Sequence, residues 1–192
     1  MRQRRLIVAS LCVAAAGALS ASVAVAAKPV ERLTAFAVDM SNLSGRARAG
    51  TVDISIDRWS TTQERDQLLA ALREGGSDSL LRALQGVKEV GYVRGGSSLG
   101  YPLRFARSID LPGGGRRVII ATDRPISFLE AVNQPRSTDY PFMILDIRLD
   151  ASGKGEGKLL PLAKISINDD HVVEIENYAN EPVRLSSVRK VT

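Results

Sequence analysis

The fold is constrained most by Tyr140-Pro141-Phe142-Met143-Ile144-Leu145-Asp146-Ile147-Arg148-Leu149. Side chains alternate between the two faces of a β-strand, and this segment is apolar on both: Phe142 and Ile144 on one face, and Met143, Leu145 and Ile147 on the other. A strand with two apolar faces is buried on both sides. We therefore expect this strand to be central in its sheet, or to be covered by a helical element.

Alternating apolar and polar residues recur along most of the chain. They predict strands over 33–40, 52–57, 87–94, 101–110, 117–123, 140–149, 158–167, 171–178 and 183–191. In the strand over 101–110, one side is expected to carry Tyr101, Leu103, Phe105 and Ile109. Because short polar turns join these strands, we expect a mainly β fold (α+β by strict count), an antiparallel meander that forms a barrel or a sandwich of about eight or nine strands.

A helical pattern interrupts the strands near residues 61–86. Thr61 followed by Glu64 is a capping-box signature, and leucines spaced along one face follow it. Gly75 and Gly76 predict a break, after which a second short helix ends at Gly86. We expect this helical hairpin to cover one open end or one face of the sheet. One or two further helical turns are expected over 126–132.

The first 27 residues resemble a cleaved export signal. Arg2, Arg4 and Arg5 precede an apolar run that ends in small residues before Lys28. We expect a signal peptide over 1–27, a single β-rich domain over 28–192, and a periplasmic or secreted bacterial protein, with no stable membrane span after cleavage. The alternative is an uncleaved anchor, which the Ala and Gly content disfavours.

Removal of this segment changes what the composition allows. The leader carries three of the 26 basic residues, so 23 basic residues remain against 21 acidic ones, a net charge of +2. Because basic and acidic residues are interspersed along the chain, we expect no nucleic-acid partner. The single cysteine, Cys12, also leaves with the leader, which excludes a disulfide or a thiolate metal site.

Two motifs resemble catalytic or metal-binding sites. Gly96 to Gly100 fits G-x-S-x-G with Ser98 in the centre, and His171 follows later in the chain, the order found in α/β-hydrolases. The segment after it alternates as a strand does, so we interpret the motif as a hairpin loop. Asp169, Asp170 and His171 are the one local cluster of potential metal ligands, and we interpret it as a turn capped by Asn168 and Asp169. The glycine-rich stretch 150–158 is also expected to be a turn, and no metal or cofactor is expected.

The remaining candidates are arginine and aromatic residues in loops and near strand ends, and they suit an anionic or amphipathic ligand. The ligand-binding residues that we predict are Arg58, Trp59, Tyr92, Arg94, Tyr101, Arg104, Arg124 and Tyr140. Some of these side chains would meet at one rim if the sheet is curved. The alternative is that Arg–Asp pairs, such as Asp123 with Arg124, only tie loops together.

Several longer stretches carry a family resemblance, namely 56–61, Glu64-Arg65, 121–126, 176–178 and 181–185. Through them the chain resembles a set of uncharacterised exported bacterial proteins. This resemblance implies one domain and export, and it names no activity or site.

Two functional hypotheses follow from the sequence. The first is a non-enzymatic periplasmic or secreted protein that binds a small or amphipathic ligand or an envelope protein. The second is a small hydrolase or isomerase that uses loop residues such as Ser98 and His171.

Overall fold

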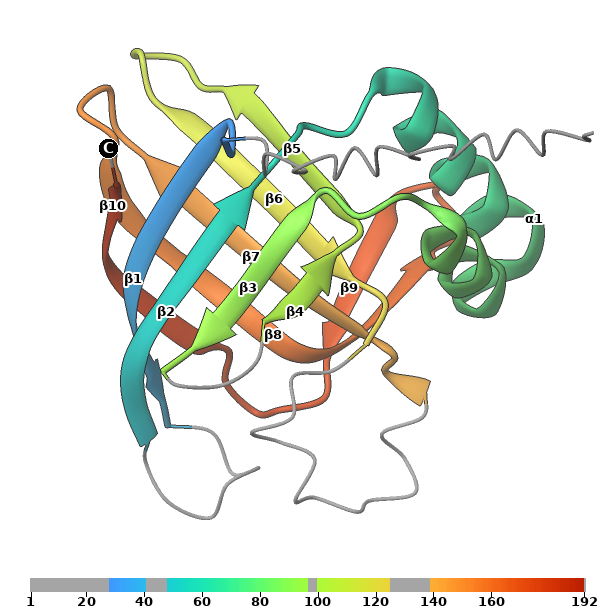
Figure 1. Cartoon of the computed structure of the whole chain (residues 1–192). Coiled ribbons are helices and arrows are strands. Elements are labelled where there is room, and N and C mark those ends of the chain that lie inside the picture. Colours follow the sequence, from blue (N-terminus) through green and yellow to red (C-terminus); the bar gives the residue numbers. More distant parts are fainter. Residues whose placement is uncertain (1–27, 41–47, 97–99, 125–138, 192) are drawn as a thin grey trace, which may run out of the picture.

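The computed structural model describes residues 28–40, 48–96, 100–124 and 139–191. Within these residues, ten strands form one antiparallel sheet that curls into a nearly closed barrel, and a helix packs against its outside (Figure 1). The prediction of a mainly β, antiparallel fold is confirmed, and the barrel is the correct one of the two predicted architectures. The predicted leader over 1–27 and the helical turns over 126–132 lie outside the described residues.

The elements in chain order are β1 (Glu31–Asp39), β2 (Arg48–Ile56), α1 (Thr62–Gly86), β3 (Gly91–Gly95), β4 (Tyr101–Leu103), β5 (Phe105–Asp110), β6 (Arg116–Thr122), β7 (Phe142–Leu149), β8 (Lys154–Ile167), β9 (Val173–Asn177) and β10 (Val183–Lys190). Across the sheet the order is β4-β3-β2-β1-β10-β8-β7-β6-β5, and β9 pairs with β8.

The double-sided strand β7 lies between two separate apolar clusters. Met143, Leu145 and Ile147 point into the barrel core, and Phe142 and Ile144 pack under α1 on the outer face. Both predictions for this strand are confirmed, because it is interior in the sheet and is covered by the helix. One strand therefore joins the barrel core to the helix layer.

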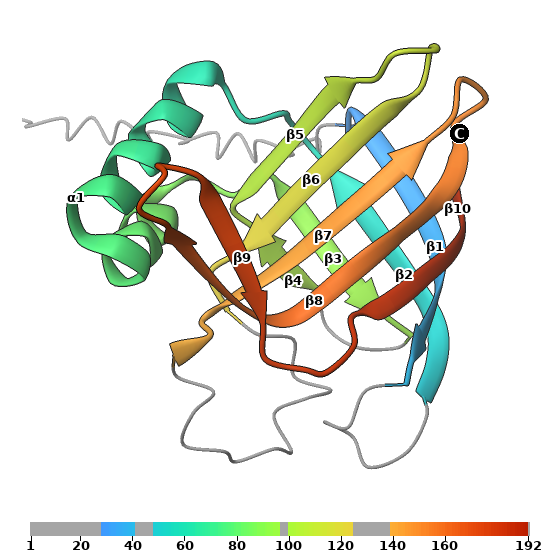
Figure 2. The ribbon, with the colours of Figure 1, turned by 180° about the vertical axis from the view of Figure 1, so that it is seen from behind.

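The helix α1 begins and breaks where the sequence predicts. The Thr61 hydroxyl accepts a hydrogen bond from the Glu64 backbone N–H at 3.1 Å, and the Glu64 carboxylate accepts one from the Thr61 N–H at 2.8 Å. The helical path is interrupted at Gly75 and at Gly76, which has φ +64°, so that α1 is a helical hairpin. Its buried leucines cover the outer face of β7 and β8 (Figure 2): Leu68, Leu72, Leu80 and Leu84.

The barrel closes where β4 passes into β5. β4 pairs with β3, whereas β5 pairs with β6. At the junction, the Arg104 backbone N–H donates to the Ala121 carbonyl at 3.0 Å. The predicted single face over 101–110 is wrong, because the alternation reverses at Arg104: Leu103 lies in the barrel core and Phe105 packs under α1.

Strand β8 is longer than predicted, and its two halves have different partners. It begins at Lys154 rather than at 158, because Gly155 and Gly157 already pair with both β7 and β10. Its second half pairs with β9, which forms a hairpin with it. Within the described residues β10 pairs with β8 and β1 and not with β9, so the last part of the chain is not a simple meander.

The strand predicted over 87–94 begins only at Gly91. The carbonyls of Val87 and Lys88 accept hydrogen bonds from arginine side chains instead of from a neighbouring strand. This short connection after α1 is therefore held by side chains, a pattern that alternation does not reveal.

We expect Gly155→Ala to lower the free energy of unfolding by about 2 kcal/mol, because the added methyl group overpacks the strand contact. A Cβ at this position would lie 1.8 Å from the Arg148 carbonyl oxygen. Urea unfolding of both proteins measures the difference. The control Gly86→Ala has nothing within 4 Å of the new Cβ and should leave stability unchanged or slightly higher; equal losses in the two variants would contradict the prediction.

Candidate functional site

Arg104, one of the predicted ligand-binding residues, lies at the seam where the barrel closes. Its guanidinium donates to the Val87 carbonyl at 3.0 Å and approaches Glu89 at 3.8 Å and Asp123 at 3.5 Å. Arg124 approaches the other oxygen of Asp123 at 3.8 Å. The Asp123 side chain is only 5% exposed, so both arginines compensate a buried carboxylate.

Arg58 also holds the short connection after α1, to which Arg104 donates at Val87. Its guanidinium donates to the Lys88 carbonyl at 2.9 Å and lies 2.9 Å from the Glu64 carboxylate. The Arg58 guanidinium also donates a hydrogen bond to the Glu64 carboxylate at 3.0 Å, and this bond is the main cause of the lowered pKa of Glu64, to which the Thr61 N–H adds. The neighbouring Trp59 packs against the barrel core.

Three further candidates lie on β3 and β4. Tyr92 is opposite Pro102 in the ladder, and Arg94 lies 3.4 Å from Asp53 on the adjacent strand β2. Tyr101 packs partly against the barrel core. These side chains stand apart from the connection after α1 that Arg58 and Arg104 hold.

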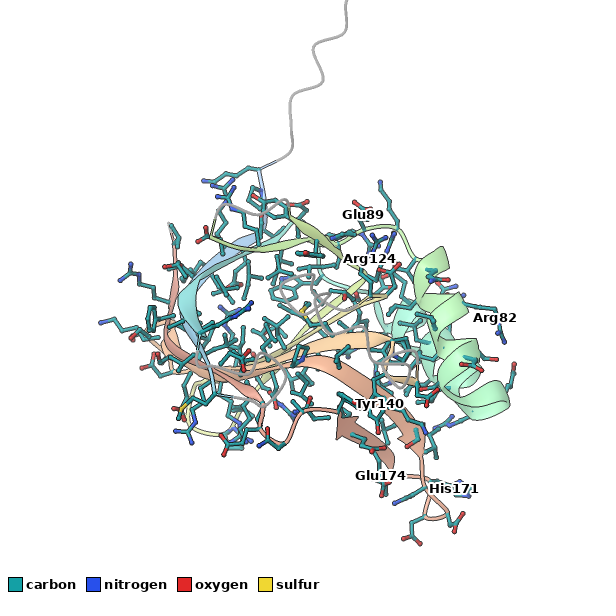
Figure 3. The ribbon with its side chains drawn as sticks, turned by 90° about the horizontal axis from the view of Figure 1, so that it is seen from below. Arg82, Glu89, Arg124, Tyr140, His171 and Glu174 are labelled. Carbon is teal, nitrogen blue, oxygen red and sulfur yellow. The ribbon has the colours of Figure 1, made fainter. Side chains whose placement is uncertain are left out.

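Tyr140 belongs to a third location, beside the β8–β9 hairpin. Its hydroxyl donates to the Glu176 carboxylate, and its ring meets the Tyr178 ring edge-on at 5.2 Å. The Glu176 hydrogen bond raises the pKa of Tyr140. Figure 3 shows Arg124 near Glu89 and well away from Tyr140. The eight predicted residues thus occupy three locations, and ligand binding at any of them stays a prediction.

Of the candidates for catalysis and metal binding, the structure describes His171 and the aspartates before it. Ser98 lies outside the described residues. His171 stands in the turn between β8 and β9, where the Asn168 side-chain oxygen accepts from the N–H groups of Asp170 and Val172 at 3.1 and 2.9 Å, as an asparagine-capped turn requires. In the described part of the chain, no group of three or more His, Cys, Asp or Glu side chains could hold a metal ion.

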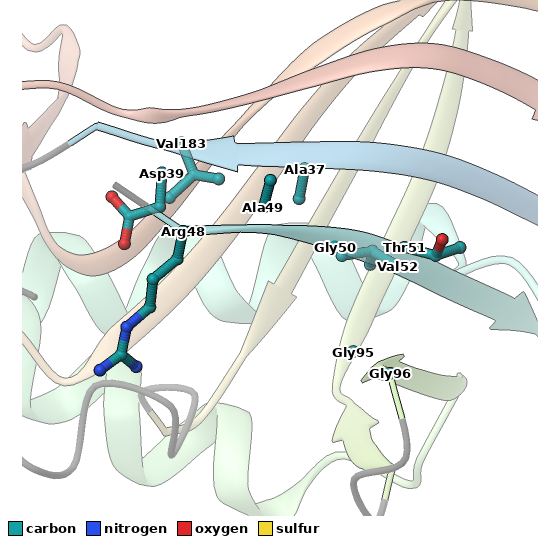
Figure 4. A pocket seen from close by; sticks show the side chains of 10 residues that line it. All are labelled: Ala37, Asp39, Arg48, Ala49, Gly50, Thr51, Val52, Gly95, Gly96 and Val183. Carbon is teal, nitrogen blue, oxygen red and sulfur yellow. The ribbon is translucent and has the colours of Figure 1, made fainter. Parts of the chain in front are cut away.

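A largely apolar pocket lies at the end of the barrel where β1 finishes and β2 begins. This pocket has a volume of about 440 Å³ (Figure 4). Small side chains and backbone supply most of its wall: Ala37, Ala49, Gly50, Thr51, Gly95 and Gly96, with Val52 and Val183. We call it the mouth pocket.

Asp39 and Arg48 supply the charges of the mouth pocket. They are directly opposite each other in the β1–β2 ladder. Asp39 is only 3% exposed, whereas Arg48 is exposed. Of these two charges, the Arg48 guanidinium is therefore the more accessible to solvent.

The other end of the barrel is crossed by an ion pair. Glu31, at the start of β1, points inward and is 5% exposed, and both of its carboxylate oxygens accept hydrogen bonds from Arg116 of β6, one of them at 2.8 Å. The pKa of Arg116 is raised, chiefly by this hydrogen bond. Between this pair and the mouth pocket, the interior is packed with aliphatic side chains.

A second, smaller hollow of about 150 Å³ lies between α1 and the outer face of the sheet. Its lining is mostly apolar and includes Leu72, Phe105 and Ile144, with Arg65 as its one charged residue. The same apolar side chains form the contact between helix and barrel. This hollow is a gap in that contact rather than a pocket with polar groups that would orient a ligand.

The sequence interpretation missed the mouth pocket because it searched for polar and aromatic residues. A sequence pattern that could have indicated the pocket is the small size of the inward-facing residues near the strand ends. Ala37, Gly50 and Gly95 stand where the deeper positions of the same strands carry Leu33, Ile54 or Val93.

Comparison with models of protein families, with curated proteins and with solved structures finds no match to this chain. In the described residues, none of the helical segments combines the length and apolar character needed to cross a membrane.

We expect Arg104→Met to lower the free energy of unfolding by about 2 kcal/mol, because the Val87 carbonyl loses a donor and the buried Asp123 loses a counter-charge. Urea unfolding measures this loss. The control Arg94→Met removes an arginine whose side chain is 50% exposed beside Asp53, and it should cost less than about 0.5 kcal/mol. Similar losses in both variants would show that the seam does not depend on Arg104.

We expect Glu64→Gln to lower stability by about 0.5 kcal/mol at neutral pH, since glutamine keeps the capping hydrogen bond and loses the ion pair with Arg58. The folded-state pKa of Glu64 is lowered, so the contribution of its charge is present above its ordinary pKa of 4.5 and is lost as pH falls below that value. Thermal unfolding from pH 7 to pH 3 should show the two proteins converging. A constant difference over that range would contradict this assignment.

Proposed function

We propose that the protein is an exported, non-enzymatic binding protein whose mouth pocket takes the apolar part of an amphipathic ligand with an anionic head group. The observation that carries this proposal is a pocket of about 440 Å³, walled mainly by alanine, glycine and valine, at one end of an otherwise filled barrel. Ligand pockets typically enclose about 300–1,000 Å³ and are mostly apolar with a few polar groups.

The apolar part of such a ligand would lie along the small residues of the wall, such as Ala37 and Ala49, and the nearly buried Val52 and Val183 complete that wall. This contact would remove apolar surface from water on both molecules, at about 25 cal/mol per Å². Glycine at positions 50 and 95 lets a ligand approach the backbone closely.

The polar part would lie at Arg48. A guanidinium binds carboxylate and phosphate groups through parallel hydrogen bonds, and Arg48 is exposed at the mouth. Asp39 is buried beside it and offers little surface to a cation. An anionic head group therefore suits this pocket better than a cationic one.

The enzymatic alternative has less support. His171 is exposed in the β8–β9 turn, and it is not among the residues that line the mouth pocket.

We expect Gly50→Val to abolish binding of decanoate, measured by isothermal titration calorimetry, because the valine side chain would fill the pocket. Gly50 has nothing within 4 Å of a new Cβ, and valine favours strands, so the variant should fold normally. The control Thr34→Val introduces the same residue at an outward position of β1 and should bind as the unmodified protein does. Unchanged decanoate binding by Gly50→Val would exclude the mouth pocket as the site.

We expect Arg48→Gln to weaken decanoate binding about tenfold, the loss of one charge-assisted hydrogen bond. Decyltrimethylammonium, with the same chain and a cationic head group, should bind the unmodified protein more weakly than decanoate. Equal affinities for the two amphiphiles, unaffected by the substitution, would contradict an anionic head group at Arg48.

A further inference from the structure

The outer face of the barrel divides into two halves of different character. On β7 and β8, the half nearer α1 is apolar and is covered by the helix. The other half is not covered by any described element, and it continues over β10 and β1 (Figure 2).

This uncovered half carries mostly basic side chains. The pairing registers place seven of them on the same outer face of β6, β7, β8, β10 and β1, with two carboxylates among them: Arg117, Arg148, Lys154, Lys158, Arg184, Arg189 and Arg32, against Asp146 and Glu156. Along the chain these residues alternate with inward-facing apolar ones, so the sheet, and not the sequence order, gathers them. We call this surface the basic face.

The face keeps an excess of five basic side chains over acidic ones, although Arg148 is opposite Glu156 and Lys158 is opposite Asp146 in the β7–β8 ladder. Arg117 forms two hydrogen bonds with Asp146, at 2.7 and 2.8 Å, which satisfies that carboxylate. Lys158 and Arg184 are directly opposite each other on neighbouring strands. Five strands at about 4.8 Å spacing span roughly 20 Å, so neighbouring charges lie within a Debye length and act together.

An exposed apolar ridge borders the basic face. Phe36 and Met40 of the β1 segment are 47% and 63% exposed. Phe36 is opposite Ser186 and Val38 is opposite Arg184, so the ridge runs directly beside the basic residues of β10. Asp39 lies between Val38 and Met40 and lines the mouth pocket, so the ridge also reaches the pocket rim.

Basic residues next to exposed apolar side chains are the composition of surfaces that lie on anionic membranes, where the cations meet phosphate head groups and the apolar groups enter the interface. We propose that the basic face, with Phe36 and Met40, docks this protein on a bilayer that contains anionic phospholipids. The ridge is what favours a bilayer over a soluble polyanion, which offers no apolar layer for Phe36 and Met40.

A hollow in the basic face fits this assignment. It has a volume of about 610 Å³ and is lined by three cations, Arg148, Lys158 and Arg184, and by two carboxylates, Asp146 and Glu156. Asp146 is already bonded to Arg117, so the hollow keeps an excess of positive charge that suits a phosphate group.

Vesicle co-sedimentation tests the proposal with the protein as recovered after export. We expect binding to vesicles of phosphatidylcholine with about one-third phosphatidylglycerol, weak binding to phosphatidylcholine alone, and loss of binding at high salt. The triple variant Arg148→Gln, Lys158→Gln, Arg184→Gln should weaken binding by about fivefold for each charge removed. Phe36→Ser should weaken it further without changing the salt dependence.

The matched control removes the same number of charges elsewhere. Arg73→Gln, Arg82→Gln and Lys88→Gln change exposed residues of α1 and of the connection after it, with Arg82 pointing away from the barrel in Figure 3. This variant should bind vesicles as the unmodified protein does. Equal losses in the two triple variants, or equal binding to both kinds of vesicle, would overturn the proposal.

A short DNA duplex serves as a soluble polyanion. If the duplex binds through the basic face and phosphatidylglycerol vesicles do not, the membrane assignment is wrong. Because Gly50→Val leaves the basic face intact, it should retain vesicle binding. Failure of the mouth pocket to bind decanoate is therefore distinguishable from failure of this proposal.

Discussion

The structure depends on the closure of the barrel at Arg104, where one extended segment changes its hydrogen-bonding partner from β3 to β6. A backbone bond to Ala121 makes the transition, and the Arg104 side chain ties the seam to the connection after α1 and to the buried Asp123. Closure gives the sheet an inside, so that one side of every strand can be packed with aliphatic residues. It also leaves ends, and the two ends of this barrel differ: Glu31 and Arg116 cross one, and small residues leave the other hollow.

The outer face of the barrel has an apolar part and a charged part, and this difference follows from the size of the helix that covers it. A helical hairpin of α1's length covers only part of the barrel, and the apolar positions of β7 and β8 that it covers are Phe142, Ile144 and Ala163. Beyond the helix, outward positions on the same strands become charged, as at Asp146, Arg148 and Lys158. The candidate pocket and the basic face are thus both places where none of the described elements covers the barrel wall.

Features that depend on neighbouring residues in the sequence were predictable. The alternation in β7, the capping box at Thr61 and the break at Gly75 are local patterns, and the structure confirms each of them. The reversal at Arg104 was not predictable, because it depends on which strands pair on either side of it. The basic face was missed for a related reason: Lys158 and Arg184 are far apart in the sequence and adjacent in the ladder. The mouth pocket depends on residue size at inward positions, which can be assigned only when the ends of the strands are known.

The ion pair between Glu31 and Arg116 and the aliphatic core beside it fill the barrel from one end as far as the mouth pocket. If the mouth pocket binds a ligand as proposed, that ligand could not pass through the protein and emerge on the opposite side. It would leave by the end at which it entered, polar end first, and a partner that received it would have to approach that same rim. Loading and unloading would therefore compete for the same few residues around Asp39 and Arg48, so that two partners could be served only in turn.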